Sequence, residues 1–202
     1  MSEAIHARFL AIAEGLSPTL HDAMARGGPV APLHGDIGAP LAERLCRSVA
    51  GQQLSVKAAR SIWARLESAR GDLPMHEFFH AVNSEAIRAC GLSSAKTRAI
   101  CAIAAEARAG GLEAEALRPL AHAERARHLT ALWGVGQWTA DMISIFYFGD
   151  EDVWPDGDVA ARKTLTRLTS PRRKTVRTAA RFAPYRSYLA LYMWRHVDAP
   201  PL

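Results

Sequence analysis

The chain has 202 residues, of which 49% are hydrophobic and 22% charged, so it can bury a substantial core and is not a disordered protein. Its formal net charge of +5 and its pI near 9.4 favour a polyanionic partner. No C-x-x-C spacing occurs among Cys46, Cys90 and Cys101, so we expect reduced core thiols. No apolar stretch reaches the roughly 18 residues of a membrane span, so we expect a cytoplasmic protein without membrane contact.

Helical periodicity dominates the sequence. Ala, Leu, Arg and Glu recur with a helical period and alternating β-branched runs are missing, so the sequence predicts an all-α fold. Ser55 is expected as the N-cap of one helix, after a turn at Gly51-Gln52-Gln53. In about the first half of the chain, helices are expected over residues 3–14, 17–26, 41–49, 55–70, 74–82, 84–90 and 94–109, with a Pro- and Gly-rich loop over 29–40.

The most informative stretch is Leu132-Trp133-Gly134-Val135-Gly136-Gln137-Trp138-Thr139-Ala140, which has apolar helical patterns on both sides. Two helices therefore meet across a very tight turn. Glycines allow the backbone to approach a ligand, and the amides at the start of the second helix carry partial positive charge, so the turn can hold a phosphate. The alternative is an ordinary helix-helix turn.

A second turn, Pro155-Asp156-Gly157-Asp158, leads into a further helix. Asp158 stands at the expected N-cap, where a carboxylate accepts amide hydrogen bonds. That structural role is the alternative to any catalytic one. Asp156 precedes Gly157 and is expected to cap or to meet solvent.

These motifs resemble the helix-hairpin-helix DNA glycosylase superfamily, and they are most similar to its 3-methyladenine DNA glycosylase II branch. In that family Leu-Pro-Gly-Val-Gly is followed two residues later by Thr-Ala, and here Trp133 replaces the proline. The resemblance implies that the hairpin contacts DNA and that its carbonyls bind Na⁺ or K⁺. It also implies that the enzyme requires no cofactor. The implied DNA contacts are Gly134, Val135, Gly136 and Thr139, and the implied cation ligands are the carbonyls of Leu132 and Gly134.

The resemblance also implies that Asp158 is the catalytic aspartate. Cleaving an N-glycosidic bond builds positive charge on the sugar, and a fixed carboxylate beside C1′ stabilises that charge. Bifunctional relatives carry a lysine where this chain has Trp138, so we expect simple hydrolysis. The spaced C-terminal cysteines of the iron-sulfur branch are also missing, so no iron-sulfur cluster is expected.

The implied base pocket consists of Trp138, Met142 and Trp194. Ring alkylation makes several purines cationic, and a cationic base stacks well on an indole face, so these residues favour alkylated bases. Met142 stands where relatives have a tyrosine, which indicates a more apolar pocket. The alternative for each tryptophan is core packing.

The segment from Val49 to Ala59 resembles the family loop that inserts a side chain into DNA. Position indicates Gln53 as the wedge that fills the gap left by a flipped base, with Leu54 as the alternative. Gln52 is a further implied DNA contact. Lys96, in a segment similar to the family's Gly-Leu-Ser-x-x-Lys, is expected to be structural or electrostatic rather than catalytic.

Together these features predict two helical lobes flanking an active-site cleft, one formed by residues 1–40 with 151–202 and the other by 41–150, with the hairpin motif at about 122–148. The expected protein is a monomeric, monofunctional DNA glycosylase of base excision repair that flips alkylated purines out of duplex DNA. The alternatives are a bifunctional glycosylase/lyase for oxidised bases, a non-catalytic helix-hairpin-helix DNA-binding protein, and an all-α protein unrelated to DNA.

Overall fold

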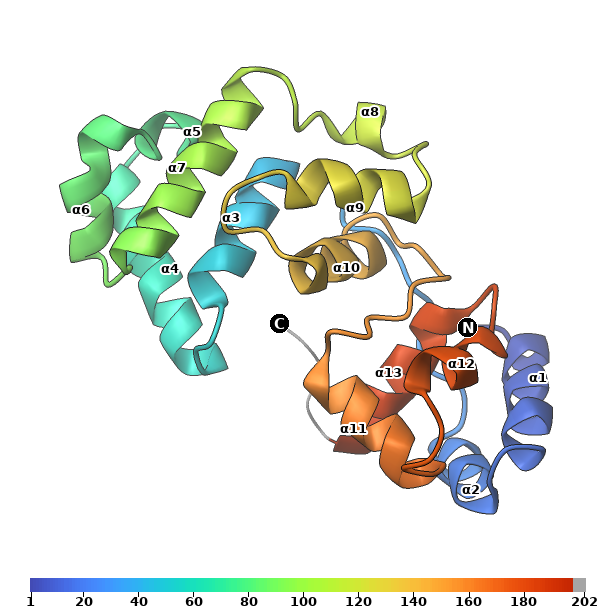
Figure 1. Cartoon of the computed structure of the whole chain (residues 1–202). Coiled ribbons are helices and arrows are strands. Elements are labelled where there is room, and N and C mark those ends of the chain that lie inside the picture. The colour runs from blue at the N-terminus through green and yellow to red at the C-terminus, as the bar shows by residue number, and fades with distance from the viewer. Residues whose placement is uncertain (198–202) are drawn as a thin grey trace. The chain divides into compact units, whose positions relative to one another are not determined.

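A computed structural model describes residues 1–197, and every regular element within them is a helix (Figure 1). The all-α prediction is therefore confirmed. None of these helices is long and apolar enough to cross a membrane. The helices are α1 (Glu3–Glu14), α2 (Pro18–Gly27), α3 (Leu41–Gly51), α4 (Val56–Arg70), α5 (Met75–Phe78), η1 (Ala81–Asn83), α6 (Ser84–Ala89), α7 (Ser94–Arg108), α8 (Ala114–Leu117), α9 (His122–Thr130), α10 (Gln137–Phe146), α11 (Val159–Leu168), α12 (Thr175–Ala180) and α13 (Arg186–Val197).

The chain divides into two compact units. Among the described residues, unit 1 contains residues 1–35 and 144–197, and unit 2 contains residues 36–143. Both boundaries fall several residues before positions 41 and 151, and the second one lies within α10. The first boundary has a local cause, since a Cβ on Gly35 would lie only 2.8 Å from the carbonyl oxygen of Tyr147. This close backbone approach ties residue 35 to the segment that follows α10.

The core of unit 1 forms where α13 packs against α11 and where α1 packs against α2. Phe9 contacts the rings of Phe182 and Tyr192, with centroid distances of 4.8 and 5.8 Å. The Ser17 hydroxyl donates to the carbonyl of Leu168 at 2.7 Å, which joins the start of α2 to the end of α11. These contacts fix α11 against the terminal helices.

The segment between α10 and α11 is anchored to the start of α13. The Ser187 hydroxyl donates to the carbonyl of Asp150 at 2.6 Å and accepts the amide of Val153 at 2.9 Å. The guanidinium of Arg186 donates to both carboxylate oxygens of Asp152, at 2.7 and 3.0 Å. The segment before α11 is therefore held by helix α13, although 34 residues separate Val153 from Ser187 in sequence.

The core of unit 2 forms where α3 packs against α7. Leu45, Val49, Ile100 and Ile103 are almost completely buried there. Cys46 and Cys90 are also buried and Cys101 is half-buried, and all three are free thiols. Burial raises the pKa of the Cys46 thiol well above its ordinary value, so this side chain stays protonated.

The expected single helix over 74–82 is wrong. The chain instead forms the short α5, breaks at Phe79 and His80, and resumes as the turn η1. Phe78 and Phe79 are both buried, and the ring nitrogen of His80 accepts the amide of Val82 at 3.3 Å, which begins the new turn. Tertiary packing and this cap override the helical pattern.

Candidate active site and DNA-binding hairpin

Asp158 is the N-cap of α11, as the sequence predicts. Its Oδ1 accepts the amide of Ala161 at 2.7 Å and the indole N–H of Trp194 at 3.0 Å. Asp158 as a whole residue is only 8% exposed. Two donors on one oxygen of a nearly buried carboxylate fix its orientation, so the capping role and a catalytic role are compatible.

Trp194 is 2% exposed, and its ring lies tilted against Phe146 with a centroid distance of 5.7 Å. Its indole N–H is directed at Asp158. The structure therefore shows Trp194 as a buried support for the carboxylate. The part of the sequence-based prediction that placed it in the base pocket stays a prediction.

Asp156, the nearest alternative carboxylate, has a structural role. Its Oδ1 accepts the indole N–H of Trp154 at 3.1 Å and the hydroxyl of Thr175 at 2.8 Å. Thr175 is the first residue of α12, so Asp156 joins the turn before α11 to the start of α12. Both aspartates therefore accept two hydrogen bonds on one oxygen, and Asp158 rather than Asp156 is assigned as the reactive group because its position matches the family motif.

In unit 2 the hairpin between α9 and α10 requires one of its glycines for steric reasons. Gly134 has a φ of +86°, and a Cβ there would lie 2.5 Å from the Cβ of Ala99. Gly136 has open space, with nothing within 4 Å of an added Cβ, and its carbonyl accepts the amide of Ala140 at 3.1 Å. Gly134 thus lets the turn pack on α7, while Gly136 opens α10.

Gln52 and Lys96 connect three motifs that are far apart in sequence. The Gln52 amide nitrogen lies 3.4 Å from the carbonyl of Gly134 and 3.3 Å from the hydroxyl of Thr139. The Lys96 ammonium donates to the carbonyls of Ala50 and Gln52, at 2.9 and 2.7 Å. The loop after α3 is therefore held against both the hairpin and the start of α7.

Partial burial lowers the pKa of Lys96. The ammonium lies on carbonyls at the C-terminal end of α3, where the helix dipole favours positive charge. Lys96 therefore has a structural and electrostatic role in this structure, as expected.

The turn after α3 exposes both wedge candidates. Gln53 has a φ of +58°, a left-handed conformation that is uncommon for a residue with a side chain, and it is exposed. Leu54 is 36% exposed. Strain of this kind often marks a functional loop, so the geometry favours Gln53 over Leu54.

The first turns of α10 carry Trp138 and Met142, one helical turn apart. Trp138 is half-buried, and Met142 is 5% exposed. Both residues lie in unit 2, whereas Asp158 and Trp194 lie in unit 1. The predicted site residues therefore come from both units.

Helix α10 also carries a buried aspartate that the sequence did not predict. Asp141 is 3% exposed, and its Oδ1 lies 3.0 Å from Nε2 of His122 and 2.8 Å from the amide nitrogen of Gln137. This cluster braces α9 against α10 and so fixes the two helices of the hairpin. The only sequence signal was the spacing of four between Gln137 and Asp141.

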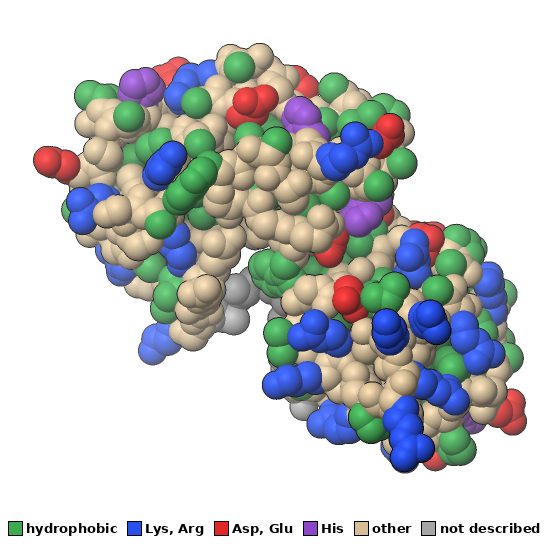
Figure 2. Space-filling model, viewed as in Figure 1, with side chains coloured by type: hydrophobic (Ala, Val, Ile, Leu, Met, Phe, Trp, Pro, Cys, Tyr) green, Lys and Arg blue, Asp and Glu red, His purple; other side chains and the backbone are tan. Residues whose placement is uncertain are grey.

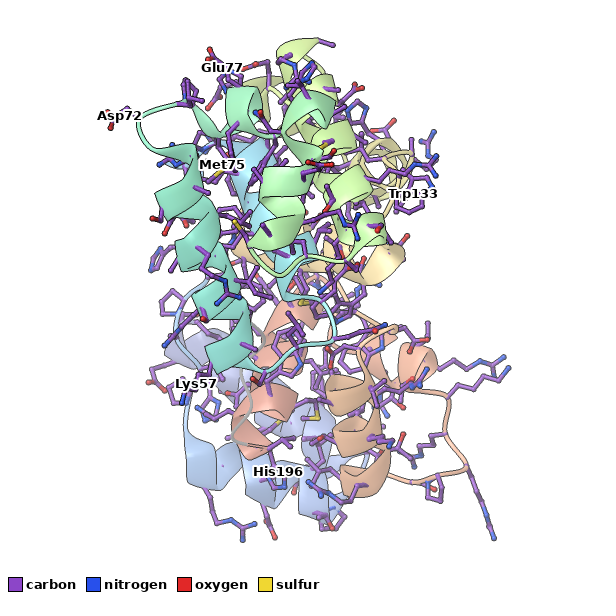
Figure 3. All side chains as sticks on the ribbon, turned by 90° about the vertical axis from the view of Figure 1, so that its left-hand side faces the viewer. Lys57, Asp72, Met75, Glu77, Trp133 and His196 are labelled. Atoms are coloured by element: carbon purple, nitrogen blue, oxygen red, sulfur yellow. The ribbon has the colours of Figure 1, made fainter. Side chains whose placement is uncertain are left out.

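Trp133, where the resembled family has proline, lies at the hairpin surface and extends outward from it (Figure 3). It is 44% exposed, and the guanidinium of Arg98 lies 4.5 Å from its ring centroid. Arg98 therefore covers one face of the indole by a cation–π contact.

The hairpin has carbonyl oxygens that can bind a cation. The carbonyls of Leu132 and Gly134 each accept one hydrogen bond, from the amide of Val135 and from Gln52, and a carbonyl oxygen has a second lone pair. Both oxygens can therefore bind a cation that prefers oxygen ligands.

A surface cavity of about 320 Å³ lies in unit 1. It is lined by residues such as Met24, Tyr192 and His196 but not by Asp158, so it is not part of this site.

Comparison with known proteins gives consistent matches. The family model described as HhH-GPD superfamily base excision DNA repair protein matches residues 46–183. DNA-3-methyladenine glycosylase 1 of Schizosaccharomyces pombe is 35% identical over 162 residues, which cover 76% of this chain and 71% of that protein. A probable bifunctional transcriptional activator/DNA repair enzyme AlkA of Mycobacterium tuberculosis is 33% identical over 172 residues, or 79% of this chain but 34% of that protein.

Among solved structures, the S. pombe 3-methyladenine DNA glycosylase (Mag1) in complex with abasic DNA is similar to this chain, with a TM-score of 0.79 and 28% identity. The match covers 93% of this chain and 95% of that one. The likeness thus extends over nearly the whole of both chains.

Proposed function

The chain belongs to the HhH-GPD superfamily of base excision DNA repair proteins, and from this premise we propose that it is a monofunctional DNA glycosylase that removes alkylated purines from duplex DNA. The observation that carries the proposal is the Asp158 carboxylate, which Trp194 and the start of α11 hold in one orientation. The similar S. pombe proteins, named as 3-methyladenine DNA glycosylases and in one case bound to abasic DNA, support the substrate class.

The proposed reaction is hydrolysis at C1′ of the flipped nucleotide. The bond from C1′ to the base nitrogen breaks and its electron pair leaves with the base, while positive charge develops on the sugar. Asp158 stabilises that charge, and a water molecule then adds its oxygen to C1′ and gives up a proton. A cationic alkylated base leaves as a neutral molecule, so one carboxylate suffices without a separate general acid.

Recognition of the base is assigned to α10. The half-buried indole of Trp138 offers a face for a cationic purine, and Met142, one turn later, adds an apolar surface. Position 138 holds no amine, so no Schiff base forms there and the product is an abasic site. In this proposal Asp158 acts on the sugar, and Trp138 and Met142 act on the base.

Holding the DNA is assigned to the hairpin and to the loop after α3. The hairpin backbone of Gly134, Val135 and Gly136 would bind a phosphate, and the carbonyls of Leu132 and Gly134 would hold Na⁺ or K⁺ there. Such a cation adds positive charge near the phosphate. Gln53 would fill the space left by the flipped base.

A base-release assay tests the proposal. The purified chain is incubated with methylated duplex DNA, and released bases are separated by chromatography. We expect free 3-methyladenine or 7-methylguanine together with intact strands that break only after alkali. Absence of any released base would contradict the glycosylase assignment and would leave a DNA-binding role.

Borohydride reduction during turnover distinguishes the two enzyme classes. A bifunctional enzyme forms a Schiff base that borohydride traps as a covalent protein–DNA adduct. We expect no adduct on alkylated or abasic duplexes. A trapped adduct would overturn the monofunctional part of the proposal and leave the glycosylase part standing.

A further inference from the structure

The positive charge of this chain is concentrated in one segment. Residues 159–197 contain ten Lys and Arg and no Asp or Glu, whereas the whole chain has 25 basic and 20 acidic residues. The rest of the chain therefore has more acidic than basic residues. The net charge of +5 comes entirely from this segment, which belongs to unit 1.

Nine of the ten basic residues are exposed, and eight of these follow one another along α11, the loop after it, and α12. We call these eight the basic ridge: Arg162, Lys163, Arg167, Arg172, Arg173, Lys174, Arg177 and Arg181. Figure 2 shows Lys and Arg side chains gathered over α11 and α12 with few acidic side chains among them.

The ridge is not neutralised by the protein itself. Among residues 1–197, none of the eight side chains forms an ion pair, and Arg173 alone has a hydrogen bond, to the carbonyl of Leu16 at 3.1 Å. A charged surface is usually solvated, but such a surface normally mixes both signs. Like charges without interspersed acids repel one another, and a polyanion relieves that repulsion.

The ridge begins next to the proposed active site. Arg162 lies one helical turn after Asp158, and its amide donates to the Asp158 carbonyl at 3.0 Å. The loop that carries Arg172 follows the other end of α11. At 1.5 Å per residue, this ten-residue helix separates the loop from Asp158 by about 15 Å.

We propose that the basic ridge is a second DNA-binding surface, distinct from the hairpin, that contacts the phosphate backbone of duplex DNA to one side of the lesion. Since one strand rises about 3.4 Å per nucleotide, a distance of about 15 Å corresponds to four or five base pairs. The inference rests on the proposed function, because it takes the nucleotide at Asp158 as its origin. Such contacts carry no sequence information and support binding to undamaged as well as damaged DNA.

Charge neutralisation with a matched control tests the ridge. The ridge variant is Arg172→Gln with Arg177→Gln, and the control is Arg88→Gln with Arg118→Gln, which removes two equally exposed charges from unit 2. Dissociation constants for an undamaged 30-base-pair duplex are measured against salt concentration. Each lost phosphate contact lowers the slope of log K against log salt by about one, so we expect a fall of about two for the ridge variant and none for the control.

Neutral methylphosphonates placed along one strand of an abasic duplex then locate the contact. We expect substitution four or five base pairs from the abasic site to weaken binding of the unaltered protein and to have no further effect on the ridge variant. A salt slope that is the same in the ridge variant and the unaltered protein would overturn the proposal. Loss of binding to phosphatidylserine vesicles with an unchanged DNA slope would overturn it in favour of a membrane surface.

Failure of the ridge and failure of the glycosylase assignment remain distinguishable. The slope is measured on undamaged DNA and does not require catalysis. Single-turnover base release at saturating enzyme reports on Asp158 and should be the same in the ridge variant and the control. Thermal unfolding of both variants checks that the exposed substitutions leave the fold intact.

Discussion

The indole N–H of Trp194 donates to the Oδ1 of Asp158 at 3.0 Å, on the same oxygen that accepts the amide of Ala161. Trp194 is among the most buried side chains of the chain, and its ring rests on Phe146. A hydrogen bond from a fixed donor to an ionised carboxylate is worth about 1.5–3 kcal/mol, roughly twice a neutral one. Asp158 is thus held by a tryptophan that lies 36 residues further along the chain.

Trp194→Phe should slow base release while leaving DNA binding nearly intact. The change removes the N–H donor and keeps an aromatic ring, so the carboxylate loses its orientation. We expect kcat to fall about 10- to 100-fold with KM changed little, in line with the free energy of one charge-assisted hydrogen bond.

A matched control comes from the same turn. Trp154 donates its indole N–H to Asp156, so Trp154→Phe removes an equivalent bond from the aspartate that has no proposed role in catalysis. Its rate should stay within about threefold of the unaltered protein. Equal losses of kcat in the two variants would show that Trp194 has a merely structural role.

The two hairpin glycines should respond differently to substitution. Gly134→Ala places a Cβ at a positive φ and against Ala99, so we expect it to lower the free energy of unfolding by about 1–3 kcal/mol. Gly136→Ala should cost less than about 1 kcal/mol, since its Cβ meets open space. Denaturant unfolding measures both, and equal costs would refute the role assigned to Gly134.

Gly136→Asp should weaken DNA binding without unfolding the protein. The added carboxylate would face the phosphate that the hairpin backbone is proposed to bind, so the loss of affinity should be similar for all sequences and greatest at low salt. Fluorescence anisotropy with undamaged and abasic duplexes measures it. Unchanged affinity in the folded variant would remove the hairpin from the DNA interface.

Lys96→Met should destabilise the protein but spare the chemistry. The ammonium satisfies the carbonyls of Ala50 and Gln52, and its loss leaves them without that donor. We expect a loss of about 1–3 kcal/mol in the free energy of unfolding and a single-turnover rate within threefold at low temperature. An inactive variant of unaltered stability would instead place Lys96 in the reaction.

Gln53→Ala and Leu54→Ala separate the two wedge candidates. If Gln53 fills the vacated position in the base stack, its removal should slow single-turnover release about 5- to 30-fold, while Leu54→Ala changes it less than threefold. The fluorescence of 2-aminopurine opposite the lesion reports the flipped state independently. The reverse order of effects would make Leu54 the wedge.

Local patterns predicted much of the fold. Ser55 and Asp158 were placed as N-caps, and the structure confirms both through side-chain bonds to the amides of Ala58 and Ala161. Helix α8 was not predicted. The buried guanidinium of Arg125 holds its C-terminal end by donating to the carbonyls of Leu117, Arg118 and Leu120. A contact of this kind leaves no local pattern.

The site was predicted as a set of residues rather than as an arrangement. The resemblance to the family indicated Asp158 and Trp194 as site residues, but nothing in the sequence indicated that the indole N–H meets the carboxylate. Likewise, the predicted DNA contact at Gln52 stays a prediction, and nothing in the sequence indicated that its side chain lies within hydrogen-bonding distance of the hairpin at Gly134 and Thr139. Such pairings depend on how helices from different parts of the chain pack, which no local spacing encodes.

The most direct test of the central claim is single-turnover release of 3-methyladenine by Asp158→Asn. Asparagine keeps an oxygen that can accept from Ala161 and Trp194, so the fold and the binding of an abasic duplex should persist. Because the negative charge is lost, we expect the rate of release to fall at least a hundredfold. A rate within tenfold of the unaltered protein, with stability and binding unchanged, would contradict the claim that the Asp158 carboxylate stabilises the reacting sugar.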